Sequence, residues 1–179
     1  MVNKQYTNPP EMQIDQEKEY FATIHTNKGD IKLKLFAADA PLTVNNFVFL
    51  VKEGFYNDVK FHRVIESFMI QTGDPLGNGM GGPGYRFADE LPPVQEYRPG
   101  IVAMANAGPD TNGSQFFICS GQDSAYLNQR PNYTVFAEVV EGMETVAKID
   151  GVSVGYSQSG ELSSPKEPVH MESVDIKEV

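Results

Sequence analysis

Short apolar runs, each ended by Gly, Pro, Asn or Asp or by a short polar turn, recur along the chain and set the strongest limit on its fold. Runs of about four to eight residues have the length of strands. Two of them, FATIHT and IKLKLF, alternate apolar and polar residues on either side of the Gly-containing turn NKGD, which predicts a β-hairpin with one buried face. Further strands are expected at residues 61–65, 68–72, 101–106, 115–120, 134–139 and 169–176.

Two stretches predict helices. Pro41 suits the first turn of a helix that ends near Glu53, where Gly54 marks the C-terminal stop, and a shorter helix is expected at residues 143–149. Strands and helices do not alternate regularly, so the pattern does not favour a parallel sheet. It favours a mainly β fold, an antiparallel barrel or sandwich whose open ends are covered by the two helices.

A single domain of residues 20–179 is expected, because a chain of 179 residues, 40% of them hydrophobic, can bury one substantial core. Residues 1–19 are polar and interrupted by Pro, so we expect an extended or poorly ordered N-terminal arm. Long ordered loops tend to carry function. Such loops are expected at residues 73–100, 107–114, 121–133 and 151–168.

The composition argues against several classes of partner. A formal net charge of −10 and scattered Lys and Arg residues oppose binding to nucleic acid or to acidic membrane surfaces. The one cysteine, Cys119, cannot form an internal disulfide, and its setting in SQFFICS favours packing in the core. Because the sequence has no apolar stretch typical of a signal peptide or a membrane span, we expect a cytoplasmic protein.

Motifs for other kinds of chemistry are weak. The segment GNGMGG at residues 77–82 has the spacing of a dinucleotide-binding loop, but Pro83-Gly84 follows where that motif needs the start of a helix. The alternative hypothesis of a dinucleotide-dependent oxidoreductase is supported by this segment alone. His25, His62 and His170 lie far apart and lack the spacing of metal ligands. A Ser-His-Asp triad stays open because its order varies between folds, although no nucleophile-elbow motif supports one.

The segment FHRVIESFMIQTGDP, residues 61–75, contains the residue that most needs an explanation. Its apolar residues predict a pair of strands, yet Arg63 lies among them, beside His62 and close to Gln71. An arginine is rarely buried unless its five N–H donors find partners. We therefore expect a specific function for Arg63.

Four segments in order carry a resemblance to a known family: FHRVIESFMIQTGDP, NGMGGPGYRFADE, GIVAMANAGPDTNGSQFFIC and YLNQRPNYTVFAEVVEGM. They resemble the cyclophilin family of peptidyl-prolyl cis-trans isomerases, and the similarity runs from about Tyr20 to the C-terminal strand. The resemblance implies a closed eight-stranded antiparallel β-barrel capped by two α-helices. It also implies a substrate groove on the outer surface of the barrel and a role as a chaperone that assists protein folding.

The resemblance also assigns roles to individual residues. Arg63 matches the catalytic arginine of the family, while Gln71 and Gln115 would hold its side chain in position. Backbone groups of Asn106 would anchor the peptide as an added strand does. For His62, a structural hydrogen bond is at least as compatible with the pattern as a catalytic duty. The expected catalytic residues are Arg63, Gln71, Phe68 and Asn106. The expected substrate-binding residues are His62, Met69, Gly79, Ala105, Ala107, Thr111, Gln115, Phe117, Tyr126, Leu127 and Tyr133.

Two aromatic positions depart from many members of the family. Tyr126 stands where many have a tryptophan, and Tyr133 stands where many have a histidine. Both changes keep an aromatic wall, so catalysis should persist. The chain contains no tryptophan, so the cyclic peptide cyclosporin would lose an indole N–H donor and should bind with weakened affinity.

The expected partners are proline-containing peptides and unfolded or native client proteins, bound by a monomer without nucleic acid or membrane. Rotation about the X-Pro bond breaks no bond to carbon and exchanges no proton, so neither a metal nor a cofactor is required. A proline-peptide binding module or holdase with incidental turnover is the alternative, because the same groove would serve it. The combination of Arg63, Gln71 and Gln115 favours the enzyme, since capture of one isomer needs no donor for the twisted state.

Overall fold

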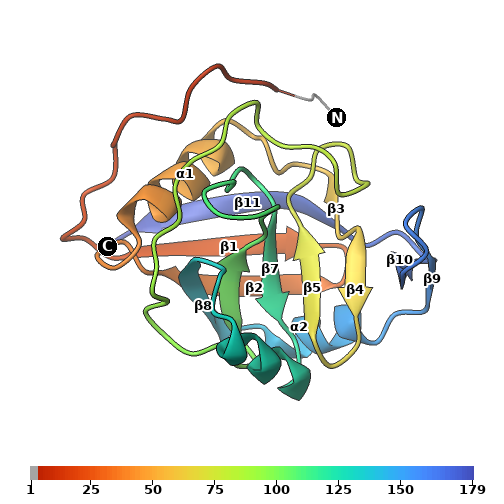
Figure 1. Ribbon diagram of the computed structural model, residues 1–179. Coiled ribbons are helices and arrows are strands. Elements are labelled where there is room, and N and C mark those ends of the chain that lie inside the picture. The colour runs from red at the N-terminus through yellow and green to blue at the C-terminus, as the bar shows by residue number, and fades with distance from the viewer. Residues whose placement is uncertain (1–3) are drawn as a thin grey trace.

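A single large antiparallel sheet dominates the computed structural model, which describes residues 4–179 (Figure 1). The order of its nine strands is β3-β11-β1-β2-β8-β6-β7-β5-β4. The strands are β1 (Tyr20–Thr26), β2 (Gly29–Leu35), β3 (Val59–Lys60), β4 (Arg63–Ile65), β5 (Met69–Thr72), β6 (Ile101–Met104), β7 (Phe116–Cys119), β8 (Val135–Glu141) and β11 (His170–Glu178).

The β1–β2 hairpin forms as its alternating pattern predicts. Tyr20, Ala22 and Ile24 point into the core, and their partners across the pair, Leu35, Leu33 and Ile31, do the same. The other predicted strands are also confirmed, with ends that differ by a few residues. Strand β3 was not predicted, because it is only two residues long.

The sheet is curled but open, so the expected closed eight-stranded barrel is wrong in its detail. Strands β3 and β4 lie at the two ends of the strand order, although only Phe61 and His62 separate them in the sequence. The chain therefore brings the two edges near each other. In the described residues no hydrogen-bonded ladder joins β3 to β4.

Strands β9 (Val154–Tyr156) and β10 (Leu162–Pro165) form a separate hairpin beside β4 (Figure 1). The sequence predicted only a loop at 151–168, so this part of the prediction is wrong. A 3₁₀-helix, η1 (Gln122–Gln129), likewise occupies most of the expected loop at 121–133.

Two α-helices pack against the sheet, as predicted: α1 (Pro41–Lys52) lies against β11, and α2 (Met143–Asp150) lies against β2, β4 and β5. Phe47 of α1 enters the core, where its ring meets those of Tyr56, Phe116 and Phe136 at centroid distances of 5.4–5.5 Å. Such aromatic contacts add to the stabilisation from apolar burial. These ring contacts hold α1 against the sheet that carries the candidate functional site.

The carboxylate of Glu90 connects the long loop 73–100 to the start of α1. Its two oxygens accept hydrogen bonds from the backbone N–H groups of Leu42 and Thr43, at 3.1 and 2.7 Å. A negative charge stabilises a helix N-terminus, where N–H groups have no partner within the helix. This contact holds the loop close to the body of the domain.

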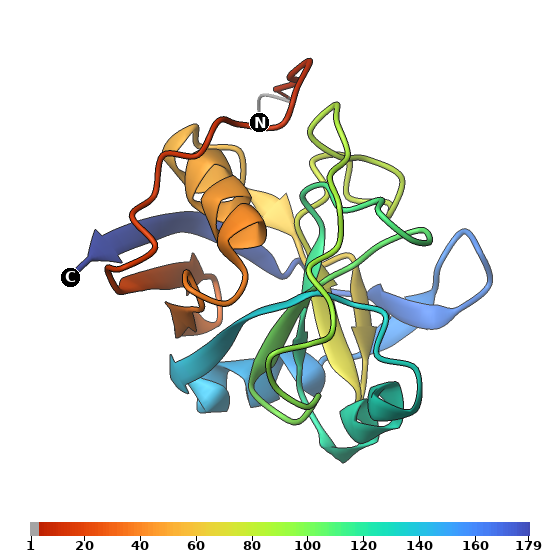
Figure 2. The same cartoon turned by 60° about the vertical axis from the view of Figure 1, so that its left-hand side comes forward.

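Residues 4–19 contain no helix or strand and run along the outside of α1 (Figure 2). The side chain of Asn45 accepts a hydrogen bond from the backbone of Gln13 and donates one to that of Glu11. The Tyr6 N–H also donates to the carbonyl of Pro83, at 2.8 Å.

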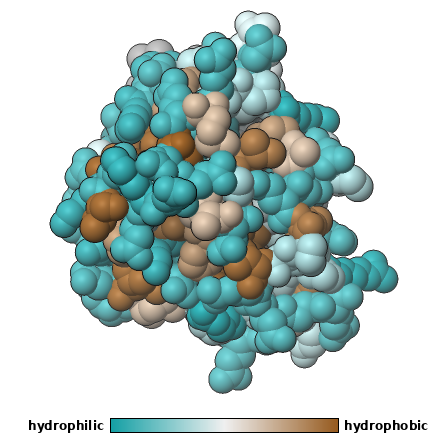
Figure 3. Space-filling view, turned by 90° about the vertical axis from the view of Figure 1, so that its left-hand side faces the viewer, coloured by the Kyte–Doolittle hydropathy of each residue, from teal (hydrophilic) through white to brown (hydrophobic). Residues whose placement is uncertain are grey.

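Seen from the left-hand side of Figure 1, the surface is largely hydrophilic, with apolar residues in small scattered groups (Figure 3). None of the helices in residues 4–179 has the length and apolar character to cross a membrane.

Candidate active site

Two adjoining hollows form a groove lined by residues of β4, β5 and β7 and of the segments around them. The larger has a volume of about 660 Å³ and the smaller about 180 Å³. Gln71, Ala105 and Asn106 line both hollows, so they form the boundary between them. An extended peptide crossing this boundary would contact both.

Most of the residues that line the smaller hollow have apolar or aromatic side chains. Phe117 of β7 packs edge-on against Tyr133 with 5.6 Å between ring centroids, which gives one wall a fixed shape. Arg63 and Gln71 supply polar groups at the side of the hollow. The lining residues are Arg63, Phe68, Met69, Gln71, Ala105, Asn106, Phe117, Leu127 and Tyr133. The arrangement suits an apolar ring of small size next to a cationic donor.

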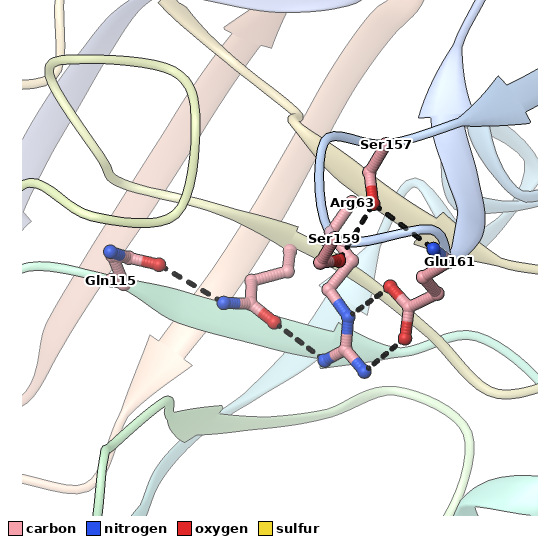
Figure 4. Close-up of polar contacts among 6 residues, drawn as sticks. Arg63, Gln115, Ser157, Ser159 and Glu161 are labelled. Carbon is pink, nitrogen blue, oxygen red and sulfur yellow. Dashed lines mark hydrogen bonds and ion pairs between the residues drawn. The ribbon is translucent and has the colours of Figure 1, made fainter.

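Strand register places Arg63 opposite Gln71, and Gln71 opposite Phe117. The Nη1 of Arg63 donates to Oε1 of Gln71 at 3.0 Å. The Nε and Nη2 of Arg63 donate to the two carboxylate oxygens of Glu161, at 2.8 and 3.0 Å (Figure 4). Arginine has five N–H donors. One N–H on Nη1 and one on Nη2 therefore take no part in these three bonds.

The side chain of Gln71 also continues the network toward the Gly-rich loop. Its Nε2 donates to Oε1 of Gln115 at 3.0 Å, and Nε2 of Gln115 donates to the carbonyls of Gly79 and Gly81 at 3.0 and 2.9 Å. Each amide is thus used at both its oxygen and its nitrogen. The chain of bonds connects Arg63 to the wall of the larger hollow.

The Gly-rich segment 77–82 is held by a buried carboxylate. Oxygens of Asp74 accept hydrogen bonds from the backbone N–H groups of Leu76, Asn78 and Gly79, at 2.8, 3.0 and 2.6 Å. A Cβ at Gly81 would lie 2.0 Å from the same carboxylate, so this approach requires glycine. The loop is not followed by a helix, and its amides already have an internal anion. The dinucleotide-binding alternative is therefore wrong.

The larger hollow is formed by the Gly-rich loop and by residues 105–115. The hydroxyl of Thr111 accepts a hydrogen bond from the Ala107 N–H and donates to the Gly108 carbonyl, both at 2.8 Å. The Asn106 side chain donates to the Asn132 carbonyl at 3.0 Å, and Asn106 lines both hollows. Gln5 of the N-terminal arm also lines this hollow.

Two of the expected site residues lie outside the lining of both hollows. Tyr126 of η1 is 69% exposed on the rim. His62 is partly buried, and both of its ring nitrogens are buried without a hydrogen-bond partner among the described residues. Burial lowers the pKa of His62, which favours the neutral ring. The expected structural hydrogen bond of His62 is therefore not found in this part of the chain.

Two further residues refine the expectations. Cys119 is fully buried, and burial raises the pKa of its thiol to about 12, so the interpretation as a core residue is confirmed. Glu161, which contacts Arg63, was missed. It lies in a polar turn, 98 residues from Arg63 in the sequence, and no local pattern indicates the contact.

Residues 21–176 match the family described as cyclophilin type peptidyl-prolyl cis-trans isomerase/CLD. The peptidyl-prolyl cis-trans isomerase A of Mycobacterium tuberculosis is 45% identical over 171 residues, which cover 87% of this chain and 91% of that protein. The chain belongs to the cyclophilin family of peptidyl-prolyl cis-trans isomerases. The peptidyl-prolyl cis-trans isomerase-like 3 of Gallus gallus is 42% identical over 158 residues, 86% of this chain and 94% of that protein.

A solved cyclophilin has a similar fold. The crystal structure of a cyclophilin type peptidyl-prolyl cis-trans isomerase from Cryptosporidium parvum gives a TM-score of 0.78 at 35% identity, covering 89% of this chain and 98% of that one. The same protein was also crystallised in the presence of the dipeptide Ala-Pro, and that structure gives a TM-score of 0.77 at 36% identity over 88% of this chain and 98% of that one. The mainly β cyclophilin fold is thus confirmed for this chain.

Proposed function

We propose that Arg63 accelerates rotation about X-Pro bonds by donating a hydrogen bond to the prolyl nitrogen in the twisted state. Rotation must break amide resonance, at a barrier of about 18–20 kcal/mol. As the bond twists, the nitrogen regains its lone pair and becomes an acceptor. A fixed donor at this position interacts more strongly with the twisted state than with either planar isomer, which lowers the barrier.

The observation that carries this proposal is that Arg63 lines the smaller hollow while two of its five N–H groups take no part in its bonds to Gln71 and Glu161. The guanidinium lines this hollow, and one N–H on each terminal nitrogen lies outside the bonds to Gln71 and Glu161. A proline ring among Phe68, Met69 and Phe117 would bring its nitrogen to that side. Arginine keeps its charge across the physiological pH range, so no titration is needed.

The residues preceding proline would lie along the boundary of the two hollows. Backbone groups of Asn106 would pair with the peptide as an added strand does. The side chains of those residues would enter the larger hollow, near Gly79, Ala107 and Thr111. The Ala-Pro dipeptide used with the Cryptosporidium relative supports proline-containing peptides as the substrate class. Accessible X-Pro bonds in unfolded or native clients in the cytoplasm, and assistance to their folding, belong to the same proposal.

Exchange spectroscopy by NMR on an X-Pro peptide tests the mechanism, because it yields the isomerisation rate constant and the peptide Kd together. Removal of a preorganised donor typically costs about a hundredfold or more in rate. Arg63→Ala should therefore lower the rate constant by about that factor and change Kd by less than about threefold. Arg98→Ala is the matched control, because Arg98 is also paired with a glutamate, Glu138, but lines neither hollow.

Equal losses in rate and affinity, or an unchanged rate, would reject this role for Arg63. A binding module with incidental turnover would instead show tight peptide binding that Arg63→Ala weakens, without a separate effect on exchange.

A further inference from the structure

Glu161, in the turn of the β9–β10 hairpin, contacts the guanidinium of Arg63 but does not line the smaller hollow. Its carboxylate accepts hydrogen bonds from Nε and Nη2 of Arg63 in a bidentate salt bridge, at 2.8 and 3.0 Å. Such a planar pair fixes direction as well as distance, because both partners are flat and meet edge to edge. We infer that Glu161 is a positioning residue for isomerisation. This inference rests on the proposed function of Arg63.

The two anchors of Arg63 restrict its side chain in complementary ways. Gln71 binds only Nη1, and a single bond allows the guanidinium to swing about that contact. The Glu161 pair holds the other edge and removes this freedom. Together the anchors occupy Nε and one N–H of each terminal nitrogen, and they leave the remaining N–H groups for the substrate. Loss of the Glu161 carboxylate would release one edge of the guanidinium, while Arg63 would keep its positive charge.

The turn that carries Glu161 is itself tied by local hydrogen bonds. The Ser157 N–H donates to the Glu161 carbonyl at 2.7 Å, and the Gly160 N–H donates to the Ser157 carbonyl at 2.9 Å. The Glu161 N–H donates to Oγ of Ser157 at 3.3 Å, and the Ser157 and Ser159 hydroxyls lie 2.8 Å apart (Figure 4). Gly160 has a φ of +88°, which the turn can adopt because glycine lacks a Cβ. The carboxylate is therefore presented from an ordered turn.

The Glu161 carboxylate of the folded protein is ionised at neutral pH. Its hydrogen bond from Arg63 is the main cause that lowers the pKa of Glu161 to about 2, with a smaller contribution from the Ser163 hydroxyl. The negative charge also weakens the attraction of Arg63 for a developing lone pair. Both side chains are more than one-third exposed, so solvent screens this opposing effect. The loss of direction should therefore outweigh the gain in net positive charge.

The test is Glu161→Gln, measured by the same NMR exchange experiment on an X-Pro peptide. Misplacement of a reacting group by about 1 Å can cost a hundredfold in rate. We expect a rate constant lower by roughly ten- to a hundredfold at saturating enzyme, with the peptide Kd within twofold. The Arg63 Nε–H resonance should also exchange faster with water, because its carboxylate partner is gone. Glu138→Gln is the matched control, since it removes a glutamate partner of Arg98 away from the groove.

A double-mutant comparison separates positioning through Arg63 from any other effect. In an Arg63→Ala background, Glu161→Gln should lower the rate by less than twofold, since the group it positions is absent. A wild-type rate in Glu161→Gln, or an undiminished loss in the Arg63→Ala background, would overturn the inference. If Arg63→Ala itself keeps the wild-type rate, the proposed function fails first. If only Glu161→Gln is without effect, Arg63 keeps its role and Glu161 loses its own.

Discussion

Arg63→Lys separates a directional donor from a simple positive charge. Both side chains are cationic at neutral pH, but their donors differ in number and geometry. In this chain the guanidinium makes two bonds to Glu161 and one to Gln71, and it retains an N–H on each terminal nitrogen. An ammonium has three N–H groups on one atom. It cannot keep the same three bonds and also donate to a prolyl nitrogen.

The expected size of the effect follows from the number of bonds lost. At least one charge-assisted hydrogen bond must be missing in the twisted state, and such a bond contributes about 1.5–3 kcal/mol. Each 1.36 kcal/mol of transition-state stabilisation is about tenfold in rate. Arg63→Lys should therefore lower the isomerisation rate constant by roughly ten- to 150-fold. The apolar lining from Phe68, Met69 and Phe117 is unchanged, so the peptide Kd should change little.

The measurement is NMR exchange on an X-Pro peptide, with thermal unfolding of the variant as a check that the fold persists. A lysine variant within twofold of the wild-type rate would refute the reasoning. In that case positive charge near the hollow would be sufficient, and the geometry set by Gln71 and Glu161 would be irrelevant to the reaction.

Other predictions follow from the same structure. Gly81→Ala should destabilise the protein by about 1–3 kcal/mol in chemical unfolding, because the new Cβ would meet the Asp74 carboxylate at 2.0 Å; Gly82→Ala should have wild-type stability, since nothing lies within 4 Å. His62 has a lowered pKa, so its contribution to stability is present above about pH 6.5 and is lost as the pH falls; His62→Phe should flatten unfolding free energy between pH 7 and 5. Hydrogen bonds to Asp175 and Asp30 raise the pKa of His25, so its contribution is present below about pH 6.5 and is lost at higher pH; His25→Gln should remove that decline. Tyr126→Trp should tighten cyclosporin binding by roughly five- to two-hundredfold without a matching gain in rate, and equal affinities in calorimetry would reject the donor argument.

Local signals in the sequence predicted the elements that are stabilised locally. The alternation in residues 20–35 gave the β1–β2 hairpin, and Pro41 and Gly54 marked the ends of α1 to within two residues. The β9–β10 hairpin was missed because its strands are short and half polar, as in LSSP at 162–165. Its stability comes from packing against β4, which no pattern within 151–168 reveals.

The candidate site divides in the same way. A resemblance over long motifs named most residues of the two hollows, including Arg63, Gln71 and Asn106. It did not indicate Glu161 or Gln5, which come from segments outside those motifs. The open edge of the sheet was also not predictable, because closure depends on hydrogen bonds between β3 and β4 rather than on the number of apolar runs.

Hydrogen bonds connect Arg63 to two loops beside the groove, and this explains why these loops should affect the chemistry. Gln71 connects it through Gln115 to the Gly-rich loop, and Glu161 connects it to the β9–β10 turn. The Gly-rich loop is held in turn by Asp74 and contacts the N-terminal arm, where Gln5 donates to the Gly82 carbonyl at 2.7 Å. A change in the β9–β10 turn therefore reaches the guanidinium through its direct bonds to Glu161, and a change in the Gly-rich loop reaches it through three successive hydrogen bonds. Because these bonds fix direction and leave the charge of Arg63 unaltered, such changes should alter the rate constant more than the affinity for peptide.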